Sequence, residues 1–229
     1  MKWISNNLEL IGQLSLDHLA IALPPILLSF ILSIPIGWLA NRFAWSRGVL
    51  LTLSSLLYAI PSLPLFIVIP VVIGTGLRDP INMTIALTLY GIALMVRSTA
   101  DGLASVDGDV IQSATAMGYS TWTRFWRVEL PLAGPVLLAG VRVVSVSTIS
   151  LTTVGAVLGI SSLGSLFTDG FQRSITAEIY TGIVVTIVLA LIFDLVIVQL
   201  GRLLMPWTRA PRKTRDDSRG RLAEREVTA

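Results

Sequence analysis

One segment between two apolar stretches is polar and has the pattern of a short helix with defined ends. Asp109 is a preferred N-cap residue type, and Gln112 follows it at the three-residue spacing of a capping box. Ser113 and Ala114 keep the helix slender, and Gly118 can adopt the left-handed conformation in which helices commonly end. These side chains offer hydrogen bonds and close contact rather than covalent chemistry. The segment is therefore suited to docking into a groove of another protein, and the alternative is an interfacial linker helix.

The side-chain groupings on which most enzymes depend are missing from the sequence. The chain has no cysteine, which excludes disulfides and thiolate metal sites, and two lysines, Lys2 and Lys213. Neither lysine follows a glycine, so no phosphate-binding loop of the Gly-x-x-x-x-Gly-Lys-Ser/Thr type occurs. The single histidine, His18, is expected to be an interfacial residue rather than a ligand. The sequence therefore predicts no enzymatic activity, no metal site and no cofactor.

Composition indicates that these polar features are carried by a membrane protein. The mean hydropathy is +0.77 and 53% of the residues are hydrophobic, more than in ordinary soluble domains. A membrane-spanning helix needs about 20 apolar residues. Five stretches qualify, at residues 19–40, 49–73, 81–103, 132–160 and 179–200. The predicted fold class is an all-α integral membrane protein with five transmembrane helices.

Prolines and flanking segments add detail to these five spans. The prolines predict kinks at Pro24, Pro25 and Pro35 in the first span and breaks at Pro61, Pro64 and Pro70 in the second. Residues 1–17 carry Ile4, Leu8 and Ile11 at helical spacing, which predicts a helix lying on the outer face of the membrane rather than a cleaved signal. Residues 18–201 form the predicted transmembrane domain. Residues 202–229 include eight basic residues and are predicted to be a disordered cytoplasmic tail that can contact anionic lipid.

The distribution of basic residues predicts the orientation of the chain. With the N-terminus outside, the cytoplasmic segments contain 13 basic residues and the outer segments contain Lys2, Arg78 and Arg173 only. This excess follows the positive-inside rule. The C-terminus and the polar helix are therefore expected on the cytoplasmic side.

Two charged residues within apolar spans are expected to form an ion pair. Arg142 lies eleven residues after Pro131 and Asp194 eight residues before Arg202. At 1.5 Å per residue these positions lie at depths of about 16 and 12 Å, close enough for an arginine to bridge. Unpaired charges within a membrane are costly, which favours pairing. The alternative is that Arg142 extends to the interface by itself.

The polar helix resembles the cytoplasmic loop of permease subunits of binding-protein-dependent type I ABC importers. That loop reads Glu-Ala-Ala, three residues, Gly, nine residues, then Ile-x-Leu-Pro. This chain matches it with Gln112, Ser113 and Ala114, then Gly118, then Val128, Leu130 and Pro131. It departs from the pattern by having glutamine for glutamate and serine for the first alanine.

The resemblance covers residues from His18 to about Gly201 and is greatest to the glycine betaine/carnitine/choline branch of these permeases. Five segments carry it, at residues 59–63, 117–119, 128–132, 139–142 and 160–164. In the last segment the branch often has Gly-Gly where this chain has Ser161 and Ser162.

The resemblance implies import of compatible solutes across a bacterial plasma membrane, driven by separate ABC ATPase subunits. The other implied partners are a second permease copy or paralogue, an extracytoplasmic substrate-binding protein and the lipid membrane, but no nucleic acid. The residues with an implied role in ATPase coupling are Asp109, Gln112, Ser113, Ala114, Gly118, Leu130 and Pro131. The alternatives are a permease for another small polar solute, such as an amino acid of the methionine type, and a membrane scaffold without transport.

Hydroxyl and aromatic side chains are candidates for the translocation path. Ser145, Thr148 and Thr152 share one helical face, where neutral hydroxyls can offer dipoles to a methylated zwitterion. Tyr58 and Tyr90 can offer cation–π contacts to a quaternary ammonium group. The alternatives are that the hydroxyls bond to their own helix and that the tyrosines serve in packing or at the interface.

Overall fold

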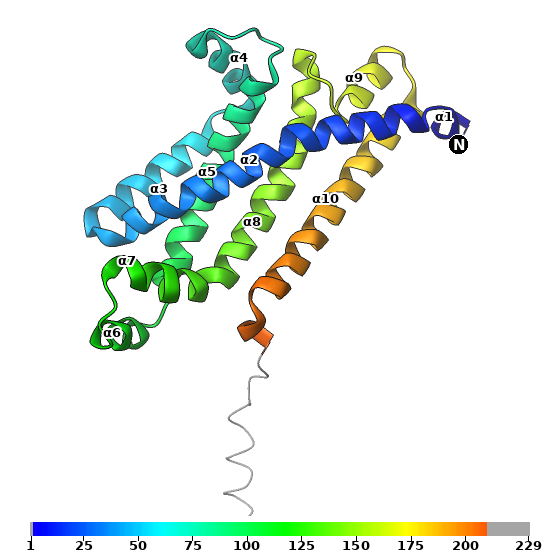
Figure 1. Cartoon of the computed structure of the whole chain (residues 1–229). Helices are drawn as coiled ribbons and strands as arrows, with labels where there is room; N and C mark the ends of the chain where they lie inside the picture. The colour runs from blue at the N-terminus through cyan, green and yellow to red at the C-terminus, as the bar shows by residue number, and fades with distance from the viewer. Residues whose placement is uncertain (1, 210–229) are drawn as a thin grey trace, which may run out of the picture.

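The computed structural model describes residues 2–209 and contains only helices, turns and connecting segments in that range (Figure 1). Four long helices are α2 (Leu8–Arg42), α5 (Pro80–Ala104), α8 (Leu130–Thr152) and α10 (Thr176–Leu204). The shorter α-helices are α1 (Lys2–Asn6), α3 (Ala44–Ala59), α4 (Ser62–Ile73), α6 (Gly108–Ala116), α7 (Thr121–Arg124) and α9 (Ser165–Gln172). A π-helix covers Phe125–Glu129, and 3-10 helices cover Thr153–Leu158 and Pro206–Arg209. The predicted tail lies outside the described residues from position 210 onward.

Within residues 2–209, four continuous helical segments are long and apolar enough to cross a membrane: Leu8–Arg42, Pro80–Ala104, Thr121–Leu158 and Thr176–Leu204. Each contains most or all of one predicted span. The predicted leader does not end at a break before the first span, because α2 starts at Leu8 and runs without interruption through Pro24, Pro25 and Pro35. Residues 1–17 are therefore divided between α1 and the first turns of α2.

The predicted span at 49–73 is two helices instead of one straight helix. The axes of α3 and α4 differ by 101° across the residues between them, so the pair is either a broken span or a re-entrant loop. Ile60 and Pro61 at the bend have extended backbones. Proline disfavours a helical conformation in the residue before it and has no N–H to donate, which explains why the helix ends here.

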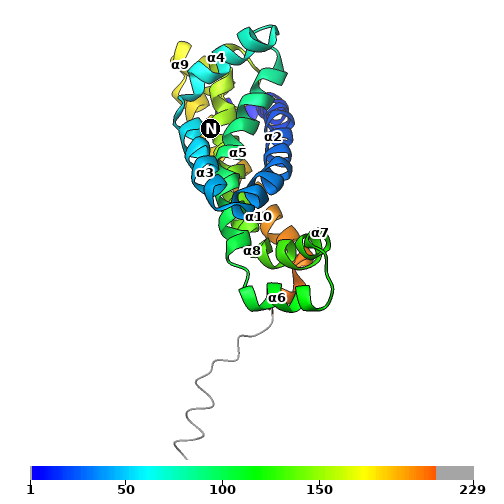
Figure 2. The same ribbon diagram turned by 90° about the vertical axis from the view of Figure 1, so that its left-hand side faces the viewer.

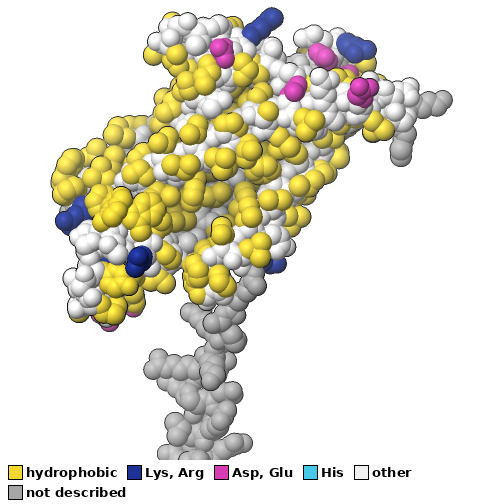
Figure 3. Space-filling view, in the orientation of Figure 1, with side chains coloured by type: hydrophobic (Ala, Val, Ile, Leu, Met, Phe, Trp, Pro, Cys, Tyr) yellow, Lys and Arg dark blue, Asp and Glu magenta, His cyan; other side chains and the backbone are white. Residues whose placement is uncertain are grey.

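The helices α2 and α8 and the bent pair α3–α4 pack around α5, which is the most enclosed span. Of its most apolar 18-residue window 61% is buried, whereas none of the corresponding window of α10 is buried within this chain. One core cluster joins α5 to α4 through Met83, Leu87, Tyr90 and Phe66, and a second joins α5 to α8 through Met95 and Val144. Apolar side chains cover the middle of the visible surface, and the coloured charged side chains gather towards its ends (Figure 3).

The two ends of the bundle differ in structure. At one end, here called the α6 end, α6 and α7 project from the bundle near the last residues of α10 (Figures 1 and 2). At the other end, here called the α9 end, lie α1, α4 and α9. The candidate functional residues are divided between these ends and the apolar middle.

Candidate functional site

The helix α6 starts two residues earlier than the sequence pattern predicts. Its N-cap is Asp107, whose carboxylate accepts a hydrogen bond from the Asp109 N–H at 2.9 Å. The Ile111 N–H donates to the Asp107 carbonyl, so helical bonding begins at Asp107. Asp109 is therefore a first-turn residue, where its charge favours the helix dipole, and Gln112 is not in the capping-box position. The prediction of Asp109 as the N-cap is therefore wrong by two residues; Asp107 is of the same residue type and caps a helix equally well.

The end of α6 is a Schellman turn centred on Gly118. Gly118 has a φ of +86°, its N–H donates to the Thr115 carbonyl, and the Tyr119 N–H donates to the Ala114 carbonyl. The left-handed stop predicted at Gly118 is therefore present. Ala114 is buried, while Gln112 and Ser113 are exposed. This arrangement anchors one side of α6 on the chain and leaves the other side free for contact.

Beyond α6, the chain re-enters the bundle through α7 and the π-helix. Leu130 is the first residue of α8 and Pro131 the second, and both follow the π-helix without a break in the helical segment. Trp122 and Trp126 are exposed on this segment, and Val110 and Met117 are exposed on α6. The α6 end thus presents apolar and neutral polar side chains together, a composition suited to contact with a protein.

The structure brings Arg142 and Asp194 together between α8 and α10. Arg142 Nε donates to Asp194 Oδ1 at 2.6 Å, and the terminal nitrogen NH2 donates to Oδ2 at 2.9 Å. This is a two-bond arrangement with the geometry that makes arginine–carboxylate pairs specific. The two side chains remain 46% and 21% exposed, so this chain alone does not enclose the pair.

Separating Arg142 from Asp194 is expected to lower the yield of folded protein. Asp194→Ala leaves an unpaired guanidinium within the apolar region and should reduce both yield and the thermal unfolding midpoint in detergent. Arg142→Ala combined with Asp194→Ala should be milder than either single change, because neither charge is then left alone. Leu195→Ala, at an exposed neighbouring position, is the control for truncating an α10 side chain. Single losses that simply add in the double variant would show that the residues are not coupled.

The candidate hydroxyls on α8 are enclosed by the chain. Ser145, Thr148 and Thr152 are all buried. The Ser145 hydroxyl donates to the Val141 carbonyl, and the Thr152 hydroxyl donates to the Thr148 carbonyl, both at 2.8 Å. These are bonds within the residues' own helix. The assignment of this face to a translocation path stays a prediction.

The two candidate tyrosines meet at the bend between α3 and α4. Their rings are perpendicular, with centroids 5.8 Å apart. Tyr90 is buried and its hydroxyl donates to the Ile60 carbonyl at the bend, whereas Tyr58 is 44% exposed. Tyr90 thereby satisfies a backbone acceptor that the broken helix leaves without a helical donor. Tyr58 is the member of the pair whose ring is accessible for a ligand contact.

A set of contacts at the α9 end was not expected from the sequence. The Thr153 N–H bonds to the carbonyls of Ser150 and Leu151 where α8 changes to a 3-10 helix, and the Ile149 carbonyl accepts a bond from His18 Nε2 at 3.0 Å instead. The adjacent Asp17 accepts a bond from the Ser161 hydroxyl at 2.6 Å. His18 is completely buried, so the expectation of an interfacial histidine is wrong. A histidine within a continuous apolar helix was the available signal for such a buried contact.

The segment after α8 is closed on itself by glycine and serine. Ser162 is buried, its hydroxyl donates to the Thr152 carbonyl at 3.4 Å, and it accepts a bond from the Gly164 N–H at 3.2 Å. A Cβ atom at Gly164 would lie 1.9 Å from the Thr153 carbonyl oxygen, so the two backbones touch directly. We call residues 153–164 the α9-end segment. The serines at 161 and 162 therefore bond to α2 and to the end of α8.

Comparison with known proteins gives the family of the chain. Residues 21–210 match the model for "Binding-protein-dependent transport system inner membrane component". The chain is 32% identical over 190 residues to the glycine betaine/carnitine/choline transport system permease protein OpuCD of Bacillus subtilis, covering 82% of each chain. It is 30% identical over 207 residues to the osmoprotectant import permease protein OsmW of Salmonella typhimurium, covering 89% of this chain and 96% of the relative.

Solved structures give the same fold. A chain of the MetNI methionine ABC transporter, in an inward-facing conformation, superposes with a TM-score of 0.78 at 17% sequence identity. The match covers 87% of this chain and 98% of that one. With helices long and apolar enough to cross a membrane and a family match over residues 21–210, the chain belongs to the inner membrane components of binding-protein-dependent transport systems.

Proposed function

We propose that this chain is the permease subunit of an ATP-driven importer of compatible solutes of the glycine betaine, choline, carnitine or proline type. The observation that carries the proposal is the similarity to permeases of glycine betaine, carnitine and choline over more than four fifths of the chain. The likeness to the methionine transporter, at 17% identity, supports the fold and gives no support for methionine as cargo. The importer works in the bacterial plasma membrane.

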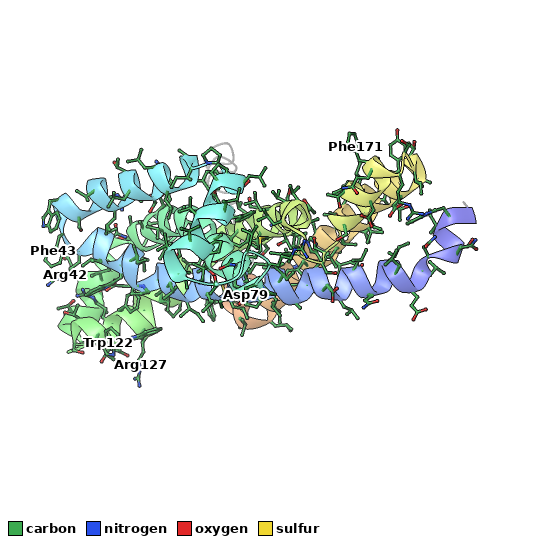
Figure 4. The ribbon with its side chains drawn as sticks, turned by 90° about the horizontal axis from the view of Figure 1, so that it is seen from above. Arg42, Phe43, Asp79, Trp122, Arg127 and Phe171 are labelled. Carbon is green, nitrogen blue, oxygen red and sulfur yellow. The ribbon has the colours of Figure 1, made fainter. Side chains whose placement is uncertain are left out.

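The permease acts with separate partners. Two ABC ATPase subunits hydrolyse ATP, a second permease copy or paralogue completes the pathway, and an extracytoplasmic binding protein delivers the solute. The α6 end faces the cytoplasm, because Arg42 and Arg127 lie at that end (Figure 4) and basic residues gather on the inner side. The exposed, capped helix α6 is then the part of the chain that the ATPase contacts, together with Leu130 and Pro131, which begin α8.

The solute crosses between the spans without being held by a full charge. Tyr58 offers the exposed ring for a quaternary ammonium group, and the hydroxyl face of Ser145, Thr148 and Thr152 becomes accessible when α8 moves relative to its neighbours. A site of neutral dipoles binds a zwitterion weakly enough to release it. This release is needed for turnover in a transporter.

Uptake by the reconstituted complex tests the cargo. The permease is purified with its ATPase, placed in lipid vesicles and supplied with the binding protein and labelled glycine betaine, choline, carnitine or methionine. We expect ATP-dependent accumulation of at least one quaternary ammonium solute and no accumulation of methionine. An ATPase with its catalytic glutamate replaced by glutamine is the control for ATP hydrolysis. Accumulation of methionine alone would contradict the proposed cargo, and no accumulation of any solute would contradict transport.

A further inference from the structure

The connection from α6 to α8 contains a π-helix that places two charged side chains side by side. The Leu130 N–H donates to the Phe125 carbonyl, five residues earlier. In an α-helix, residues five apart point about 140° away from each other, since each residue turns the helix by about 100°. The wider turn instead lets Arg124 and Glu129 meet, with Nε donating to Oε1 at 2.7 Å. Single π-turns within α-helices occur frequently at functional positions.

The same guanidinium also reaches back to α6. The Arg124 terminal nitrogen NH1 donates to the Thr115 hydroxyl oxygen at 2.8 Å. The Thr115 hydroxyl in turn donates its proton to the Ile111 carbonyl, also at 2.8 Å. One side chain thus bonds to the last turn of α6 and to the residue that precedes α8. Arg124 and Glu129 are only 20% and 14% exposed, so solvent screens this pair less than a surface ion pair.

Aromatic packing fixes the segment that carries Arg124. Phe125 is buried and packs edge-on against Trp38 of α2, with ring centroids 6.1 Å apart. Trp122 and Trp126 flank Phe125 at 6.3 and 5.2 Å. The backbone that carries Arg124 is therefore held in place by aromatic packing rather than lying in a loose loop. A displacement of α6 would act on a segment that cannot easily deform.

From these contacts we propose that Arg124 is a positioning residue that transmits the displacement of α6 to α8. This inference rests on the proposed function, because it assumes that the ATPase moves α6. The backbone that connects α6 to α8 passes through Gly118. Because glycine has no Cβ to restrict its φ and ψ angles, this turn can bend and transmits a displacement of α6 poorly. The Thr115–Arg124–Glu129 link bypasses that turn. The link ends at Glu129, which directly precedes α8. This helix carries Ser145, Thr148 and Thr152.

The ratio of ATP hydrolysed to solute imported tests the link. The variants are Arg124→Ala, Thr115→Val, which removes the hydroxyl on α6, and Glu129→Gln, which removes the charge that precedes α8. We expect each to keep ATP hydrolysis near the parent rate while solute uptake falls, by about tenfold for Arg124→Ala, as expected from loss of a hydrogen-bonded charge. Arg127→Ala is the matched control, because that nearby arginine side chain points outward (Figure 4). Arg124→Lys keeps the charge but lacks the guanidinium that bonds Thr115 and Glu129 at once. It should give a ratio of ATP hydrolysed to solute imported between those of the parent and Arg124→Ala.

Equal losses of hydrolysis and uptake in the three variants would overturn the proposal, since they would indicate a purely structural role. So would an unchanged ratio in Arg124→Ala. A second measurement separates this test from the cargo test. Because the chain has no cysteine, Leu39→Cys on α2 and Val143→Cys on α8, both exposed, can be spin-labelled in the complex with its ATPase. ATP should change the distance between the labels in the parent chain and not in Arg124→Ala, whatever solute is carried; the same change in both would also overturn the proposal.

Discussion

Gly164→Ala is expected to prevent the chain from reaching its folded state in useful amounts. The new Cβ would lie 1.9 Å from the Thr153 carbonyl oxygen and 2.7 Å from the carbonyl carbon. Both are backbone atoms at the end of α8, so no side-chain rotation relieves the contact. Overpacking in a well-packed core commonly lowers the free energy of unfolding by about 1–3 kcal/mol. A clash with backbone atoms should cost at least the upper value of this range, because backbone cannot rotate away as a side chain can. We expect little monodisperse protein in detergent and a thermal midpoint many degrees below that of the parent.

The matched control is Gly48→Ala in α3. No heavy atom lies within 4 Å of the position that its Cβ would occupy. Alanine at an unhindered helical position should leave the free energy of unfolding unchanged or raise it by about 0.4–1 kcal/mol. The gain arises because alanine gives the unfolded chain fewer backbone conformations than glycine does. Equal yields and midpoints for Gly164→Ala and Gly48→Ala would show that the approach of residue 164 to residue 153 is not essential.

Gly118→Val should leave the spans folded and separate ATP hydrolysis from transport. No heavy atom lies within 4 Å of a Cβ at Gly118, so the expected damage is confined to the backbone. A β-branched residue at a φ of +86° costs about 1–3 kcal/mol, comparable with the hydrogen bonds that close the end of α6. The last turn of α6 should unwind, and the complex should assemble poorly or hydrolyse ATP without importing solute. Hydrolysis and uptake measured in the same vesicles give the result.

Two further substitutions show whether backbone conformation is the cause. Gly108→Ala adds a Cβ at the other end of α6, again with no atom within 4 Å, and should import normally. Gly118→Asn should retain more uptake than Gly118→Val, since asparagine tolerates the left-handed region. Gln112→Glu, at an exposed position, should be tolerated. Normal coupled uptake by Gly118→Val would remove the case for a required left-handed turn.

The sequence was sufficient where one strong local signal governs the structure. Long apolar runs located the long helices, because burying a backbone in lipid requires helical bonding. Gly118 marked the end of α6, because few residues other than glycine adopt a φ of +86° easily. The start of α6 was misplaced by two residues, since Asp107 and Asp109 are chemically equivalent caps and only the hydrogen bonds from the Asp109 and Ile111 N–H groups to Asp107 distinguish them.

Features set by contacts between distant residues were beyond the sequence. Pro61 indicated a break, but the 101° bend depends on how α4 packs against α5. The π-turn before Leu130 was not predicted, and the contacts of Arg124 with both Thr115 and Glu129 are seen only in the structure. Arg142 and Asp194 were easier, because two charges in apolar helices at similar depth leave few other partners.

Two bonds of α2, one between Asp17 and Ser161 of the α9-end segment and one between His18 and the Ile149 carbonyl of α8, bear on the leakage of solute when the importer has no ATP. On the proposed orientation the α9-end segment lies at the outer mouth, and moving α2 away from it and from the end of α8 would separate His18 Nε2 from the Ile149 carbonyl. An unsatisfied buried acceptor costs about 1–3 kcal/mol, and this cost alone would keep the population of the open state between about one part in five and about one part in 160. A cell that accumulates solute to withstand osmotic stress loses it through any pathway that opens spontaneously. The helix α2 would thus act as a seal whose strength limits passive efflux between ATP-driven cycles.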